Sequence, residues 1–70
     1  MNMNERDSVK KKILDSQEMV RDYEMLAKQT TDTELAETFK IFAEESGMQA
    51  RRLQAIMDKM EGKSKKFKRK

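Results

Sequence analysis

Two stretches of the sequence place apolar residues alternately four and three positions apart. The first stripe runs from Val9 to Ala27 and the second from Leu35 to Met60. The positions of the first stripe hold Val9, Ile13, Ser16, Val20, Tyr23 and Ala27, and those of the second hold Leu35, Phe39, Phe42, Ser46, Gln49, Leu53, Ile56 and Met60. Ser16, Ser46 and Gln49 are the polar exceptions. This spacing predicts two amphipathic helices, each with a coiled-coil-like seam along one side.

Start signals for the first helix lie just ahead of its stripe. Asn4 and Asp7 are residue types that favour a helix N-terminus. The whole chain has no proline and only two glycines, so nothing in the composition interrupts the helix. We therefore expect a first helix over about residues 5–29.

A polar run separates the two stripes and contains a capping box. The Thr31 hydroxyl is suited to accept from the backbone N–H of Glu34, and the Glu34 side chain to reach back to Thr31. Gly62 follows the last apolar residue, where it favours the end of a helix. These signals predict a second helix over about residues 32–61.

A connection this short makes the two helices antiparallel neighbours. The predicted domain is therefore a helical hairpin over residues 1–62. Ser16 lies about fifteen residues before the turn and Ser46 about fifteen after it, so both lie roughly 22 Å from the turn at ~1.5 Å per residue. Gln49 lies one turn further along, and these three polar residues form one interruption of the apolar seam.

A single hairpin leaves part of its seam in contact with water, and a lone core of ~70 residues rarely supplies more than ~3–5 kcal/mol. We therefore expect an all-α fold in which two hairpins form a homodimeric four-helix bundle. The expected dimer core comprises Val9, Ile13, Val20, Tyr23, Leu35, Phe39, Phe42, Leu53, Ile56 and Met60.

Composition excludes several kinds of site. The chain has no cysteine and no histidine, so it lacks thiolate and imidazole metal ligands and the base of a common nucleophilic dyad. No apolar run approaches the ~18–20 residues of a membrane span, and the N-terminus lacks the apolar segment of a signal peptide. We expect a cytoplasmic protein with no membrane span.

The arrangement of Tyr23, a turn, and then Phe39 to Glu45 and Ala50 to Leu53 resembles the helix pair of the ferritin-like superfamily, closest to rubrerythrin-type sequences. The resemblance covers about residues 9–60. It implies a ferritin-like four-helix bundle whose two helix pairs hold a dinuclear iron centre. It also implies a glutamate seven residues before Tyr23 and a Glu-x-x-His motif before Ala50.

The chain departs from the family at the metal ligands themselves. Ser16 and Ser46 stand where glutamates are implied, and Gln49 stands where the histidine is implied, whereas Tyr23 is retained. Neutral hydroxyl and amide groups are weak ligands for iron, which favours carboxylates and imidazole. We therefore expect a degenerate metal site with no bound metal, no cofactor and no catalytic residue.

These observations favour a non-catalytic homodimer that acts as a structural, scaffolding or regulatory interaction protein with a protein partner still to be identified. A first alternative is a rubrerythrin-like iron-binding protein or oxidoreductase with a weak, rearranged site. Ser16, Ser46 and Gln49 form a polar layer that is expected to fix the register of the helices. The other interpretation of this layer is a small water-filled pocket that binds a ligand.

Residues 63–70 form a basic segment that we expect to be disordered, because its like charges repel one another. Its candidate contacts with a polyanion are Lys63, Lys65, Lys66, Phe67, Lys68, Arg69 and Lys70. Lysine and arginine bind phosphates by releasing counterions, and an aromatic ring stacks on bases. A nucleic-acid-binding dimer is therefore the second alternative.

Overall fold

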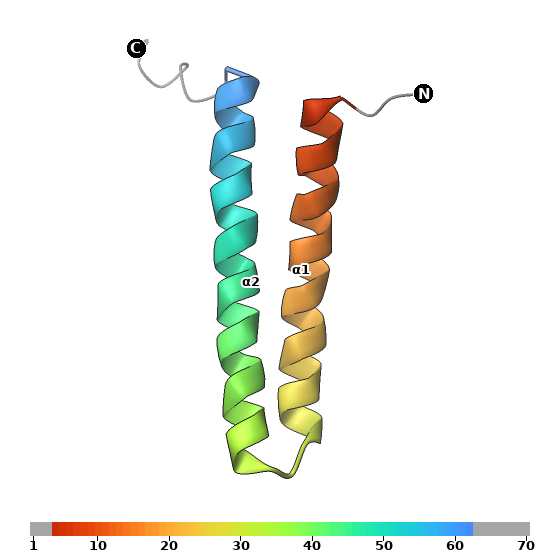
Figure 1. The fold of residues 1–70 in the computed structure, drawn as a ribbon, viewed down its shortest axis with the longest axis vertical. Coiled ribbons are helices and arrows are strands. Elements are labelled where there is room, and N and C mark those ends of the chain that lie inside the picture. Colours follow the sequence, from red (N-terminus) through yellow and green to blue (C-terminus); the bar gives the residue numbers. More distant parts are fainter. Residues whose placement is uncertain (1–3, 63–70) are drawn as a thin grey trace.

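The computed structural model describes residues 4–62 and shows two α-helices joined by a short loop (Figure 1). Helix α1 spans Glu5–Gln29 and helix α2 spans Thr33–Met60. The helices lie side by side and antiparallel, so the start of α1 and the end of α2 lie at the same end, opposite the loop (Figure 1). The prediction of an all-α fold built from two packed helices is confirmed.

Local hydrogen bonds explain the outer ends of the hairpin. The Asn4 side chain accepts from the backbone N–H of Asp7 at 2.8 Å, which satisfies one of the free donors at the start of α1. Gly62 has a φ of 77°, and its N–H donates to the Lys59 carbonyl at 3.0 Å. This is the left-handed conformation in which glycine commonly ends a helix, as the sequence indicated.

The start of α2 differs from the expected capping box. Asp32, rather than Thr31, is the N-cap, and its carboxylate accepts from the backbone N–H of Leu35 at 2.8 Å. The Thr30 hydroxyl in turn accepts from the N–H of Asp32 at 3.2 Å. A carboxylate both accepts strongly and interacts favourably with the helix dipole, so Asp32 displaces the weaker hydroxyl cap by one position.

The core between the two helices is made mostly of small side chains. Its buried apolar residues are Ile13 and Ala27 of α1 and Ala43, Ala50 and Met57 of α2. Ser16 and Ser46 are buried with them, at 9% and 8% exposure. Among the described residues, no large side chain is completely buried. Small side chains let the helix axes approach closely, but they bury little apolar surface.

An aromatic cluster near the loop holds the two helices in register. The Tyr23 ring stacks on Phe39 with their centroids 5.9 Å apart, and meets Phe42 edge-on with their centroids 5.4 Å apart. At the other end of the hairpin, Arg6 and Glu61 form an ion pair at 3.7 Å. This register brings Ser16 of α1 close to Gln49 of α2, whereas Ser46 lies nearer Met19 and Tyr23.

Candidate interaction face

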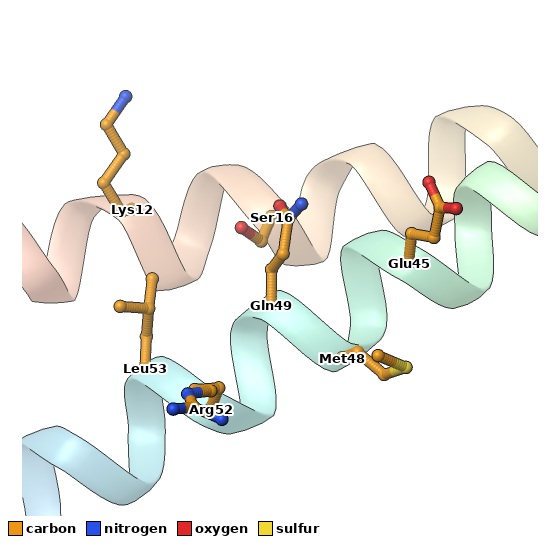
Figure 2. A pocket seen from close by; sticks show the side chains of 7 residues that line it. All are labelled: Lys12, Ser16, Glu45, Met48, Gln49, Arg52 and Leu53. Atoms are coloured by element: carbon orange, nitrogen blue, oxygen red, sulfur yellow. The ribbon is translucent and has the colours of Figure 1, made fainter.

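One side of the hairpin has two neighbouring hollows that share Glu45 and Gln49. The first, the central hollow, is lined by Lys12, Ser16, Glu45, Met48, Gln49, Arg52 and Leu53 (Figure 2). The second is lined by Met19, Tyr23, Phe42, Glu45, Ser46 and Gln49. Both helices contribute to both hollows, so these residues define one continuous side of the molecule.

This side continues along the full length of the helices. On α2, Leu35 and Ile56 lie seven residues before Phe42 and seven after Gln49, so all four share one row. We call this side the apolar face, and it comprises Met19, Tyr23, Leu26, Leu35, Phe42, Leu53, Ile56 and Met60 around the polar Ser16, Ser46 and Gln49.

Large apolar side chains are exposed on this face. In the described part of the chain, ten large hydrophobic residues are exposed, and six of them belong to the apolar face. Those six are Met19, Leu26, Leu35, Phe42, Ile56 and Met60, between 39% and 44% exposed. Large apolar side chains that gather in exposed positions on one side of a protein are typical of an interaction site.

The opposite side of the hairpin is charged. Its main hollow is lined by Val20, Ala43, Gly47 and Met48 together with the charged Glu24, Lys40, Glu44 and Arg51. Such a surface is stable in water without a covering partner. Leu14, in a neighbouring hollow of this side, is 61% exposed, but more of the exposed large hydrophobic residues lie on the apolar face, which is therefore the better candidate for a covering partner.

The polar interruption lies at the centre of the apolar face. Figure 2 shows Gln49 extending from α2 to the level of Ser16 on α1. No hydrogen bond between described residues joins Ser16, Ser46 and Gln49 to one another. The same part of the chain has no buried side-chain nitrogen or oxygen without a partner, so the two buried serines still reach solvent through their hydroxyls. The three side chains therefore remain available to form hydrogen bonds across the face.

The donor set at this centre does not fit a dinuclear iron site. The positions that the ferritin-like resemblance assigns to ligands are occupied by two hydroxyls and one amide, which cannot neutralise two iron cations. Within residues 4–62, no three His, Cys, Asp or Glu side chains are grouped closely enough to hold a metal ion. Glu45 is the only carboxylate among the residues lining the two hollows of this face.

The residues expected in the dimer core occupy different depths in the single hairpin. Ile13 is buried between the helices. Val9, Val20, Tyr23, Phe39 and Leu53 are half-buried. Leu35, Phe42, Ile56 and Met60 are exposed. Ala43, Ala50 and Met57 supply the buried contact between the helices, and the larger residues of the α2 seam lie beside this contact and stay partly exposed.

The two stripes do not include every residue that lines this side of the hairpin. Lys12 and Met19 line the hollows, and Leu26 continues their row at the same seven-residue spacing. This seven-residue spacing runs parallel to the first stripe and indicates that these residues lie on the same side of the helix. Glu45 and Arg52, which also line the central hollow, repeat at seven residues on α2.

The expected polyanion contacts, Lys63, Lys65, Lys66, Phe67, Lys68, Arg69 and Lys70, lie outside the described residues. Over the part of the chain that the structure does describe, neither helix combines the length and hydropathy that crossing a membrane requires.

No protein-family model matches the chain, and neither a curated protein nor a solved structure matches it. The resemblance to the ferritin-like superfamily therefore rests on the sequence positions given above, and membership of that superfamily stays a prediction.

Proposed function

We propose that this chain is a non-catalytic interaction protein that works as a homodimer. Two hairpins pair through their apolar faces and form a four-helix bundle with ferritin-like architecture and a degenerate metal site. The observation that supports this most strongly is the gathering of exposed large hydrophobic residues on one side of the hairpin, including Phe42 and Ile56. The bundle then serves as a structural, scaffolding or regulatory element whose outer surfaces contact other proteins.

The thin core of the single hairpin supports the same proposal. Three of its five buried apolar residues are alanines, which contribute little hydrophobic free energy. Isolated helices in water depend on tertiary packing of an apolar side for most of their stability. A second copy of the face supplies that packing, because an isologous two-fold contact covers the same residues on both partners.

The non-catalytic part of the proposal rests on the chemistry at the centre of the face. Ser16, Ser46 and Gln49 offer hydroxyl and amide groups, which pair well with one another or with water in a bundle interior. They provide neither a general base nor a strong metal ligand. In the dimer, two copies of this polar layer lie at the bundle centre and specify how the helices align.

Sedimentation equilibrium at micromolar concentration tests the dimer. The expected mass is that of two chains, and Ile56→Asp is expected to shift it toward one chain by placing a charge on the apolar face. Leu14→Asp is the matched control, because Leu14 is 61% exposed and lines a hollow of the other side. A monomeric wild-type chain would refute the proposal, as would equal dissociation of the two variants.

Metal analysis of the purified protein, followed by titration with ferrous iron, tests the non-catalytic interpretation. We expect no stoichiometric iron and no absorption band of an oxo-bridged pair. Bound iron in stoichiometric amount with that band would instead support a rubrerythrin-like iron protein with a rearranged site. Glu45 would then be the first residue to replace, since it is the carboxylate that lines both hollows.

A further inference from the structure

The outer edge of the apolar face on α2 has a directional pattern of charge. Thr38, Glu45, Arg52 and Lys59 are seven residues apart, so they form one row along the helix. The half nearer the loop contains Glu45, and the half nearer the open end contains Arg52 and Lys59. Glu45 and Arg52 both line the central hollow, which places them on the face rather than behind it.

The polar layer lies halfway along the hairpin. The middle of the 28-residue α2 falls between Ser46 and Gly47, and Gln17 is the central residue of the 25-residue α1. At ~1.5 Å per residue, Glu45 lies about 2 Å from this middle toward the loop, and Arg52 about 8 Å toward the open end. Any symmetric pairing with full overlap therefore brings the two polar layers together.

Two symmetric pairings keep the helices of both copies aligned. A two-fold axis along the helices places both loops at the same end and sets α1 of one copy over α2 of the other. A two-fold axis across the helices places the loops at opposite ends and sets each helix over its own counterpart. Overlap of the polar layers is the same in both, so it does not distinguish them.

The charges do distinguish them. With both loops at one end, Lys12 and Arg52 of the partner subunit lie at the same level, because each is five to six residues from the middle on the open side. Like charges at this separation repel. With the loops at opposite ends, Arg52 comes within about 6 Å, along the helix axis, of Glu45 of the partner subunit, at ~1.5 Å per residue. Both residues then lie on the same edge of the bundle. The two copies of Glu45 then lie about 4 Å apart along the axis, so the four side chains form one row in which each Glu45 is next to Arg52 of the partner subunit.

We propose that the two hairpins pair with their loops at opposite ends and that Glu45 and Arg52 form reciprocal ion pairs between subunits. This pairing rests on the proposed dimer and specifies its geometry. Side-chain size supports it as well, because the aromatic half near Tyr23 and Phe42 then covers the aliphatic half near Ile56 of the other copy. Large and smaller side chains that face each other fill space better than two bulky layers.

Charge reversal at Arg52 gives the first test. Arg52→Glu places two acidic groups together at each of the two sites, and we expect the dimer dissociation constant to rise about 10-fold or more. Arg51→Glu is the matched control, since it changes net charge identically but lies on the charged side of α2. The double variant Glu45→Arg with Arg52→Glu restores opposite charges across the interface and returns the constant toward the wild-type value.

The opposite pairing predicts the opposite sign. With the loops at one end, Arg52→Glu would place a carboxylate beside Lys12 of the partner subunit and strengthen the dimer. Tighter association of this variant would therefore overturn the proposed geometry, and so would an effect no larger than that of Arg51→Glu.

Distances between spin labels give a test that is independent of affinity. The chain has no cysteine, so a single introduced cysteine labels one position per copy. Thr31→Cys, at the loop, is expected to give labels about 42 Å apart at ~1.5 Å per residue, because each lies 14 residues beyond the middle of α1. Gln17→Cys, at the middle of α1 and on the other side of the hairpin, is the control, because its labels have no separation along the helix axis in either pairing and give a shorter distance set by the width of the bundle.

The outcomes separate the geometry from the proposed function. A dimeric mass with short distances at both label positions overturns the antiparallel pairing but leaves the homodimer standing. A monomeric mass with no measurable distance between labels overturns the homodimer itself. A dimeric mass with a long distance at Thr31→Cys and a short one at Gln17→Cys supports both.

Discussion

Replacing the two glycines of the chain by alanine should change stability in opposite directions. Gly47 lies inside α2, where glycine is about 1 kcal/mol less favourable than alanine. A Cβ atom at Gly47 would lie 3.8 Å from Cγ2 of Val20 and 3.9 Å from Nη1 of Arg51, which are ordinary contact distances. The residue also lines the charged side, so the added methyl does not enter the proposed dimer interface. Gly47→Ala should therefore stabilise each chain by about 1 kcal/mol.

Gly62→Ala is the matched comparison. No atom lies within 4 Å of a Cβ placed there, so packing does not change. The φ of 77°, however, is a left-handed conformation that costs a residue with a Cβ atom about 1–2 kcal/mol. Gly62→Ala should therefore destabilise the end of α2, although the two substitutions are chemically identical.

Thermal unfolding by circular dichroism at one fixed protein concentration measures both effects. For a domain of this size, about 1 kcal/mol corresponds to a change of about 4–8 °C in Tm. We expect Gly47→Ala to raise Tm and Gly62→Ala to lower it. A lower Tm for Gly47→Ala would refute the reasoning, because it would mean that glycine is needed there for a closer contact than the hairpin shows.

Three further substitutions test the local structure. Asp32→Ala should lower the free energy of unfolding by about 1 kcal/mol, because it removes the N-cap of α2. Thr31→Ala should change it by less than about 0.5 kcal/mol. Equal losses for the two variants in urea unfolding would mean that Thr31 caps the helix instead. Tyr23→Leu removes two ring contacts worth about 0.5–1.5 kcal/mol each, while Tyr23→Phe retains them, so the two variants should differ in Tm. Arg6→Ala breaks an exposed ion pair and should cost no more than about 1 kcal/mol at low salt; a larger loss, or one insensitive to salt, would contradict this.

Much of the backbone could be predicted from residue types with strong local effects. Asn4 ahead of an apolar-periodic segment indicated the N-cap of α1, and Gly62 after the last apolar residue indicated the left-handed end of α2. These predictions succeeded because capping depends on groups within three or four residues of one another. The start of α2 was wrong by one residue because Thr31 and Asp32 are both competent caps, and sequence alone does not weigh a carboxylate against a hydroxyl.

The side of α2 that meets α1 was harder to predict. The periodicity contains two overlapping stripes, one of large residues such as Phe42 and Ile56 and one of small residues such as Ala43 and Ala50. Both stripes have the same seven-residue spacing, so the spacing does not tell which of them faces α1. The distance at which the two helices pack determines that. The small stripe lies inside because it lets the helices pack closely. The role of the row that contains Glu45 and Arg52 could not be predicted, because it depends on where the polar layer lies relative to the middles of the two helices.

The alanine-rich contact between the helices has a consequence for the abundance of the protein. If most of the apolar packing comes from a second copy, folding follows mass action, and Tm rises with protein concentration. At low concentration most copies of the chain are then unfolded and open to proteolysis, whereas at high concentration dimerisation keeps them folded. The amount of protein in the cell would thus set the fraction that is folded, and this small hairpin would respond to its own level of synthesis without binding any ligand.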